Sequence, residues 1–381
     1  MNRPVLIWLL VALGILTEGY GISVGTYTAR ALATDWSLDR TTVGTAFTAA
    51  LVGMIIGGPL FGAVADRHGR RLALVATVAI VAAGLVATAY ASGMRSMIAC
   101  RFLTGIGLGG LLPAAAVMVF ENADRQWRAI AVAGLFAAVA IGSNASNWIA
   151  ERHEADWRAA FSTGGWTAAA IAVLLLITLR DGATTPVASP RSGLGSEMAR
   201  RKGAFTALGL ALLCGQVAVY GFTLSLSALL KSAGVSAERS ETVMSIYHLT
   251  GLVGGLFAAW LIGRGVRYAA ALLPAIGAVL MACAMLFGSD PNILGIIGSL
   301  AGFAVAGNLI ALTAATPFPF DRAWRVTAAG CVLSFSRLGS IADAAYGSTL
   351  GSTALLGICA LTLALGALCA ATLPIRNDLA P

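Results

Sequence analysis

The residues best suited to chemistry in this sequence are ionisable side chains that interrupt long apolar segments. They are Glu18, Arg101, Glu121, His248, Arg337 and Asp343. Such groups are costly inside a lipid bilayer, and those that occur there mark ion pathways, proton relays or internal ion pairs. A carboxyl group can bind and release a proton, and a guanidinium can hold a carboxylate through two parallel hydrogen bonds. These residue types predict traffic of protons and small organic anions through a membrane.

The positions of these residues along their segments separate them by depth. Glu18 lies about thirteen residues, or about 20 Å, beyond the start of its predicted helix, past the middle of a bilayer. Asp343 lies a similar distance along its own segment, whereas Arg101 is only a few residues into its segment, close enough to the interface to extend partly toward it. Histidine as a residue type titrates in a range suited to proton traffic, but the place of His248 beside Tyr247 also fits a hydrogen-bonded packing residue.

Composition excludes a soluble globular protein. Of 381 residues, 58% are hydrophobic and 11% are charged, against about 25% charged residues in soluble domains. The net charge of +8 comes from basic residues in the loops between apolar segments, so it indicates membrane topology rather than nucleic-acid binding. The six cysteines lie inside apolar segments without a C-x-x-C pair or a histidine at ligand spacing. We expect no metal and no cofactor.

A membrane enzyme or a non-transporting sensor is the alternative from another functional class. An enzyme would need a nucleophile with its base or a set of metal ligands, and two of the three histidines, His68 and His153, lie in predicted loops. A sensor would usually carry a sizeable soluble domain, and no segment of the sequence has that composition. We therefore do not expect an enzyme.

Twelve apolar segments reach the length of about 20 residues that a helix needs to cross a bilayer. They cover residues 5–30, 42–65, 71–91, 97–120, 128–150, 160–179, 204–231, 241–263, 268–288, 292–316, 325–350 and 352–373. This layout predicts an all-α polytopic membrane protein with 12 transmembrane helices in two six-helix bundles around a central cavity. The first bundle covers residues 1–180, a polar cytoplasmic linker covers 181–203, and the second bundle covers 204–381.

The distribution of basic residues predicts the orientation. With both termini in the cytoplasm, sixteen of the 25 basic residues fall on the inner side, seven fall outside and two lie within segments. The first segment imitates a signal peptide, but Glu18 and Gly19 interrupt it too early, so an uncleaved helix is expected. We expect a monomeric multi-pass protein of a bacterial inner membrane.

A short stretch between the second and third segments carries the most specific pattern. Residues 62–71 read GAVADRHGRR, with one acid and three arginines in a tight hairpin. The pattern G-x-x-x-D-R-x-G-R-R resembles the loop 2–3 signature of the major facilitator superfamily (MFS). The resemblance implies a cytoplasmic charge cluster that acts as a conformational latch, formed by Gly62, Asp66, Arg67, Gly69, Arg70 and Arg71. The alternative is that these charges only set the topology.

The fourth segment carries a second pattern. Residues 101–110 read RFLTGIGLGG, and R-x-x-x-G-x-G-x-G resembles the MFS signature that is associated with proton coupling. The alternative is a glycine-rich packing seam with an interfacial arginine. The fifth segment has no proline and so lacks the Gly-Pro motif typical of drug/proton antiporters, which argues against drug efflux.

Three segments narrow the resemblance to the aromatic acid:proton symporters. The fourth continues to Pro113 and Glu121, and the eleventh contains SRLGSI at 336–341 after Gly330. The first has Glu18, Gly19 and Tyr20 where that family usually shows Asp-Gly-Tyr/Phe-Asp. Gly21 replaces the second acid, which leaves one membrane carboxylate where the family tends to have two.

The resemblance and the residue chemistry together predict the site. Proton coupling is expected from Glu18, Asp343 and Glu121, although Glu121 also suits a structural role beside the charged loop. The expected contacts with a small organic anion, such as a hydroxybenzoate, are Arg337, Arg101, Tyr20, Asn144, Asn147, Gln216, Tyr220, His248 and Asn308. The open alternative is an MFS carrier or exporter of a sugar, an amino acid, another carboxylate or a drug.

Overall fold

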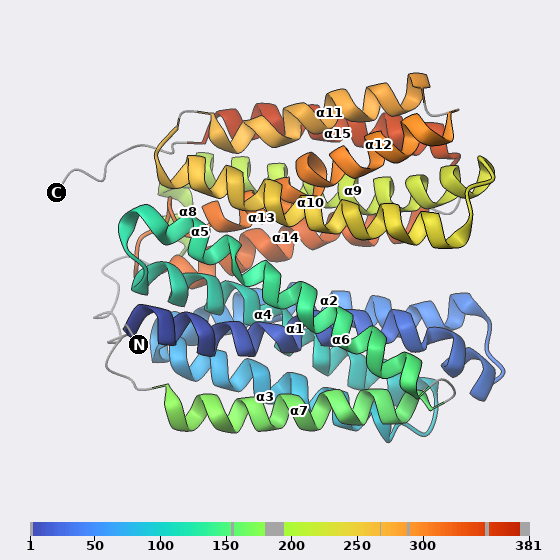
Figure 1. Ribbon diagram of the computed structural model, residues 1–381. Helices are drawn as coiled ribbons and strands as arrows, with labels where there is room; N and C mark the ends of the chain where they lie inside the picture. The colour runs from blue at the N-terminus through green and yellow to red at the C-terminus, as the bar shows by residue number, and fades with distance from the viewer. Residues whose placement is uncertain are drawn as a thin grey trace. The chain divides into compact units, whose positions relative to one another are not determined.

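The computed structural model describes residues 3–153, 156–179, 194–266, 268–287, 290–346 and 350–373. Within these ranges the side chains of residues 40, 41, 194, 237, 291 and 343–346 also lie outside the description. The described chain is helical and contains no β-strand (Figure 1).

The helices follow the predicted apolar segments. The first half contains α1 (Arg3–Asp35), α2 (Arg40–His68), α3 (Arg70–Ala89), α4 (Met94–Asn122), η1 (Arg125–Trp127), α5 (Arg128–Ala133), α6 (Leu135–Arg152) and α7 (Trp157–Thr178). The second half contains α8 (Leu194–Arg200), α9 (Lys202–Ser232), α10 (Ala237–Gly263), α11 (Ala269–Phe287), α12 (Pro291–Ala301), the π-helix η3 (Gly302–Ala306), α13 (Gly307–Ala315), α14 (Arg325–Tyr346) and α15 (Ser352–Ala371).

Eleven helical stretches in the described residues are long and apolar enough to cross a membrane. The fifth is built from η1, α5 and α6, and the tenth from α12, η3 and α13. The remaining predicted segment, 325–350, forms the 22-residue helix α14, which is more polar than the others and is not among the eleven. These helices confirm the predicted all-α polytopic fold.

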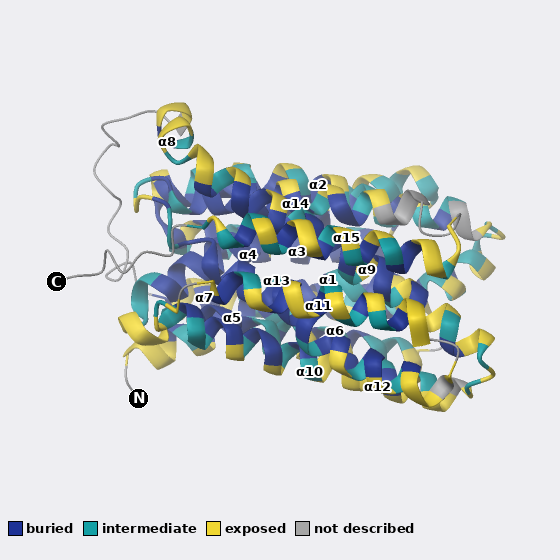
Figure 2. Cartoon of the chain, turned by 90° about the horizontal axis from the view of Figure 1, so that it is seen from above, coloured by how far each residue is buried: buried dark blue, intermediate teal, exposed yellow. Residues whose placement is uncertain are grey.

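The outward faces of the helices suit lipid. Figure 2 shows exposed residues as stripes along helices whose other faces are buried. Many exposed positions are large and apolar, such as Leu286 at 76%, Ile177 at 72% and Leu368 at 68% exposed. A water-soluble protein rarely presents so much contiguous apolar surface, so a bilayer is the solvent that these faces require.

The chain packs as two compact units. Unit 1 consists of Met1–Ala123, Gly134–Glu197 and Phe320–Ser334, and unit 2 of Asp124–Ala133, Met198–Pro319 and Phe335–Pro381. Two short segments belong to a different unit from the residues on both sides of them in the sequence. Residues 124–133 pack with unit 2, and residues 320–334 pack with unit 1.

Glycines bring α2 and α4 into backbone contact inside unit 1. A Cβ at Gly57 would collide with the carbonyl oxygen of Ile106, and one at Gly109 would collide with that of Met54. Gly107, between these positions on α4, faces α3, where a Cβ would lie 2.8 Å from the Thr77 carbonyl oxygen. Small residues drive such packing in membranes because lipid provides no hydrophobic force between helices. The glycine-rich pattern of α4 is therefore a packing seam, whatever else it does.

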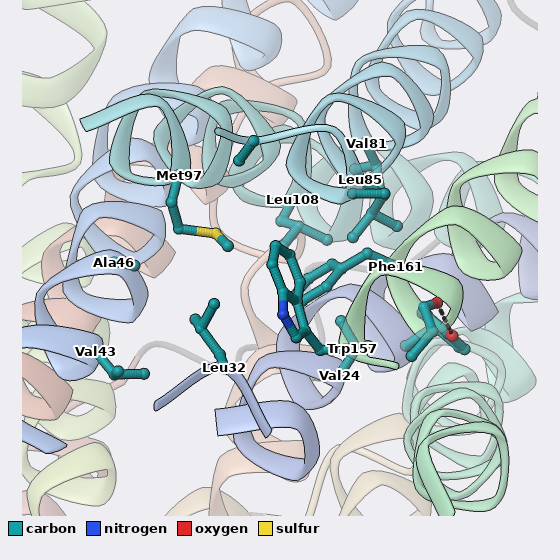
Figure 3. Close-up of a cluster of buried hydrophobic side chains, with 14 of the residues drawn as sticks. Val24, Leu32, Val43, Ala46, Val81, Leu85, Met97, Leu108, Trp157 and Phe161 are labelled. Carbon is teal, nitrogen blue, oxygen red and sulfur yellow. Dashed lines mark hydrogen bonds between the residues drawn. The ribbon is translucent and has the colours of Figure 1, made fainter. Parts of the chain in front are cut away.

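Aromatic rings fill the core of unit 1 toward the C-terminal end of α1. Trp157 and Phe161 of α7 meet edge to face with ring centroids 6.1 Å apart, and Trp36 packs on Trp157 at 5.3 Å. Figure 3 shows Trp157 and Phe161 surrounded by aliphatic side chains, among them Leu108 from α4. This cluster fixes α7 against α1 and α4, the helices that carry the buried residues Glu18 and Arg101.

Unit 2 uses the same kind of contact between α10 and the π-helix. A Cβ at Gly254 would collide with the Phe303 carbonyl oxygen, and one at Gly302 would collide with that of Tyr247. Tyr247 is fully buried and packs on Phe222 of α9, with ring centroids 5.7 Å apart. The irregular turn at 302–306 is thus held tightly against α10.

Gly57→Ala is expected to lower the stability of the protein by about 1–3 kcal/mol, because overpacking against a backbone oxygen forces two helices apart. Gly44→Ala on the same helix is the matched control, since a Cβ at Gly44 meets nothing within 4 Å. The measurement is the melting temperature of each purified variant in detergent. Equal melting temperatures for the two variants would contradict the packing described for α2 and α4.

Candidate functional site

Arg101 is a fully buried guanidinium in unit 1. The residue is 2% exposed, and its Nη2 donates to the Gly21 carbonyl of α1 at 3.0 Å. The guanidinium carbon lies 6.0 Å from the ring centre of Phe47 and 5.6 Å from that of Phe161. Its Nε and Nη1 have no hydrogen-bond partner among the described residues. The rings of α2 and α7 therefore enclose Arg101 within unit 1.

Glu18 is buried in the middle of α1 and is 2% exposed. It precedes Gly21 by three residues, so the two positions share a face of the helix. That face meets α3 and α4, since a Cβ at Gly21 would contact Leu108 at 3.2 Å and Val81 at 3.7 Å. The same short stretch of α1 thus carries a buried carboxyl residue and accepts a hydrogen bond from a buried guanidinium of α4, which makes it a candidate for an ion-coupled site.

Tyr20 is placed for packing rather than for substrate. Its hydroxyl donates to the Ala160 carbonyl at 2.6 Å, and its ring fills the space beside Gly164 of α7. The residue is 7% exposed. A side chain with a satisfied hydroxyl and a buried ring has little capacity left for a ligand, so we assign Tyr20 to the contact between α1 and α7.

The charged loop 62–71 forms a cluster with the start of α14, inside unit 1. The Asp66 carboxylate accepts from the backbone N–H groups of Val326 at 3.3 Å and Thr327 at 2.8 Å, and from the Thr327 hydroxyl at 2.7 Å. Asp66 thereby caps the N-terminus of α14 from another helix. Gly62 permits the approach, since a Cβ there would lie 2.6 Å from the Thr327 Cα.

Arg70 links the acids of this cluster. The residue is 1% exposed, and its Nη2 lies 3.3 Å from Asp66 and 3.4 Å from Glu121. The same nitrogen donates to the Arg322 carbonyl at 2.7 Å, and Nη1 donates to the Ala65 carbonyl at 3.2 Å. These contacts of the guanidinium are internal and polar, as its burial demands.

Glu121 is shared by three arginines. Besides Arg70, its carboxylate lies 3.1 Å from Arg325 and 3.7 Å from Arg322. This environment supports the structural alternative for Glu121 over proton coupling, because three cations already compensate its charge. We name the group Asp66, Arg70, Glu121, Arg322 and Arg325 the charge cluster.

The other residues of the loop have different surroundings. Gly69 alone joins α2 to α3 with φ +100°, a conformation that favours glycine. Arg71 donates from Nη2 to the Leu176 carbonyl of α7 at 2.7 Å. Arg67 is exposed, so of the six predicted latch residues it is the one most easily explained by topology alone.

The predicted polar residues of α6 lie along one helix of unit 1. Asn144 is exposed and donates to the Ala140 carbonyl at 2.8 Å, and Asn147 donates to the Glu151 carboxylate at 2.8 Å. Asn147 also lines a cavity of about 570 Å³ with Arg30 near the C-terminal ends of α1 and α6. The structure brings Asn147 to a hollow surface but satisfies both amides locally.

The remaining predicted contacts belong to unit 2. Gln216 of α9 is buried, and its Cβ lies 3.1 Å from where a Cβ at Gly339 of α14 would stand. Asn308 of α13 is 1% exposed and lies against Gly215 of α9. The structure therefore gathers Gln216, Asn308 and the segment of α14 that begins at half-buried Arg337.

Three further predictions have less support or fall outside the description. Tyr220 is 37% exposed. His248 meets the Tyr247 ring edge to face at 5.2 Å, which fits the packing alternative. Asp343 lies in α14, but its side chain is outside the described residues. No group of three potential metal ligands occurs within the part of the chain that the structure describes.

Sequence reasoning missed the partners of the predicted residues. Arg322, Arg325 and Thr327 complete the charge cluster, and Phe47 and Phe161 enclose Arg101. The only sequence signal for the first group is the pair Arg322 and Arg325 at the start of the apolar segment 325–350, which is the most polar of the twelve. Nothing in the local sequence marks the two phenylalanines.

Comparison with known proteins agrees with this architecture. The family model described as Major Facilitator Superfamily matches residues 8–342. A gallate transporter from Pseudomonas putida is 26% identical over 93% of this chain and 87% of its own length. The 4-hydroxybenzoate transporter PcaK from Pseudomonas aeruginosa is 26% identical over 90% of this chain and 85% of its own length.

A solved structure supports the fold. The fucose:proton symporter FucP of E. coli matches with a TM-score of 0.77 at 12% identity, covering 97% of this chain and 98% of that one. At this identity the likeness shows the fold alone. The matching family and these relatives are transporters, which confirms the prediction that the protein is not an enzyme.

Asp66→Ala is expected to destabilise the protein by about 2 kcal/mol or more, because it removes the cap of α14 and leaves Arg70 with one acid fewer. Arg67→Ala, one residue further on and exposed, is the control and should leave the melting temperature unchanged. Thermal unfolding of both variants in detergent measures the effect. A melting temperature of Asp66→Ala equal to that of the wild type would mean that the charge cluster does not hold α14.

Proposed function

The chain belongs to the Major Facilitator Superfamily, and on that premise we propose that it is a proton symporter for a small aromatic carboxylate. The observation that carries the coupling is the pair of buried ionisable groups on α1 and α4. Glu18 and Arg101 are each 2% exposed, and Arg101 binds the backbone of α1 one turn from Glu18. Ionisable residues inside a membrane mark ion paths and proton relays, so this pair is the candidate link between a proton and an anion.

The relatives support the class of substrate. Gallate and 4-hydroxybenzoate, the compounds in the names of two relatives, are both benzoates with hydroxyl groups on the ring. Such an anion needs a buried cation, and a guanidinium can meet its carboxylate with two hydrogen bonds. Arg337 and Arg101 are the two arginines within predicted spans, and they are our candidates for binding the carboxylate of the substrate.

The mechanism we infer is alternating access. Glu18, and Asp343 where it contributes, takes up a proton from the periplasm, which removes a buried negative charge. The protonated, anion-loaded protein then closes outside and opens inside, where both ligands leave. The charge cluster holds the cytoplasmic end of α2 to the start of α14 until that step. The orientation that this requires has both termini in the cytoplasm, in a bacterial inner membrane, and the working unit is a monomer.

Glu18→Gln is expected to abolish accumulation of the substrate against its gradient, because an amide cannot carry the proton. The measurement is uptake of radiolabelled 4-hydroxybenzoate into proteoliposomes with an inward proton gradient imposed or collapsed. Glu241→Gln, at an exposed position of α10, is the control and should accumulate like the wild type.

The results separate the parts of the proposal. Accumulation by the wild type that Glu18→Gln loses supports the symporter and identifies its proton carrier. Accumulation that Glu18→Gln retains would exclude Glu18 and leave Asp343 as the carrier to test. Absence of any uptake or binding of aromatic acids by the wild type would overturn the substrate class.

A further inference from the structure

Asn308 carries a buried amide that the protein leaves without a partner. The residue is 1% exposed, and neither its Oδ1 nor its Nδ2 has a hydrogen-bond partner among the described residues. Most buried side-chain polar atoms in proteins are hydrogen-bonded, because desolvating an amide without replacing its bonds to water is unfavourable. A buried amide without hydrogen bonds calls for an explanation, and transient binding of a ligand to the amide would provide one.

The backbone around Asn308 makes room for this amide. Gly215 of α9 stands opposite, and a Cβ there would lie 2.9 Å from the Asn308 Nδ2. On the other side Gly307 meets the backbone of α10, where a Cβ would lie 2.8 Å from the Gly255 nitrogen. Gly215 thus lets α13 bring this side chain close to α9, and Gly307 lets α13 pack against α10.

The helix is irregular directly before this residue. The π-helix η3 spans Gly302–Ala306, so the regular i to i−4 ladder is interrupted one turn or less from Asn308. Single π-turns within α-helices occur frequently at functional sites. This irregularity is independent of the missing hydrogen bonds and marks the same place.

Two uncharged polar residues, Gln216 and Ser340, lie where this stretch of α9 meets α14. Gln216 follows Gly215 and packs against Gly339 of α14. Ser340, the next residue, is 3% exposed, and its hydroxyl also has no partner in the described chain. An amide offers two donors and an acceptor, and a hydroxyl offers one donor and accepts as well. Such a set suits a neutral group that both donates and accepts, as a phenolic hydroxyl does.

We propose that Asn308 is the specificity-determining residue that hydrogen-bonds a hydroxyl group on the ring of the transported acid. The inference rests on the proposed function and deepens it, since it names the feature of the substrate that is recognised. A buried group built to hydrogen-bond a hydroxyl rejects the analogue that lacks it, because the group is then left unpaired. An apolar pocket of the same shape would distinguish the two acids poorly.

The experiment compares binding of 4-hydroxybenzoate and benzoate to purified protein in nanodiscs, by displacement of radiolabelled 4-hydroxybenzoate. The wild type should bind 4-hydroxybenzoate at least about tenfold more tightly than benzoate. Asn308→Leu, which keeps the volume and removes the polar atoms, should bring the two affinities within about twofold and retain benzoate binding. Asn292→Leu is the control, because that amide already accepts from Arg239 at 2.9 Å, and it should keep the wild-type ratio.

Each outcome decides the inference. An Asn308→Leu protein that keeps the preference for 4-hydroxybenzoate would overturn it, and so would a wild type that binds both acids equally. The latter result would leave the proposed function intact, whereas a wild type that binds neither acid would overturn the proposed function itself. If Asn308→Leu binds neither acid, Asn308→Ser is the deciding variant, because its hydroxyl should retain part of the preference for 4-hydroxybenzoate. An Asn308→Ser protein that keeps the full wild-type preference, or shows no preference, would contradict the proposal.

Discussion

A bilayer interior does not solvate charge or unpaired polar groups, and this constraint governs where polar side chains can lie in the described chain. The two buried arginines of unit 1 show two responses to it. Arg70 has two carboxylates and two backbone carbonyls around it. Arg101 has one carbonyl and two aromatic rings. The first guanidinium is committed to structure, and the second retains the capacity to bind another group.

The glycines make these polar contacts possible. Gly62 lets the start of α14 come close enough for Asp66 to reach two backbone N–H groups. Gly215 leaves the space that the Asn308 amide occupies. Since lipid supplies no hydrophobic force between helices, close backbone packing must stabilise the contacts that hold polar groups inside. Glycine spacing and buried polar residues are therefore two parts of one arrangement.

Much of the fold could be predicted from the sequence, because the length of an apolar segment is a local property. The membrane helices and the family signatures followed from runs and spacings that need no tertiary information. The partners of the signature residues did not, since Thr327 and Arg325 lie more than 200 residues from Asp66 and Glu121. Local sequence alone could not connect positions so far apart.

The surroundings of individual side chains could not be predicted for the same reason. Arg101 is close to the start of its helix, and the local sequence does not indicate that Phe47 and Phe161 from two other helices enclose it. Tyr20 was predicted as a substrate contact, and the local sequence does not indicate that Gly164 leaves room for its ring or that the Ala160 carbonyl accepts from its hydroxyl. In each case the deciding neighbour belongs to another helix, and its place is fixed only when the unit packs.

Charged and neutral groups have different roles in the symport that we propose. A buried guanidinium attracts any carboxylate, so it selects a class of substrate but cannot distinguish one benzoate from another. It also retains the anion strongly in a medium of low dielectric constant. Release then needs a competing negative charge, and the ionised form of a nearby carboxyl group such as Glu18 supplies one once its proton has left. A neutral amide adds selectivity without adding charge, so it can tell substrates apart while leaving the release step to the proton.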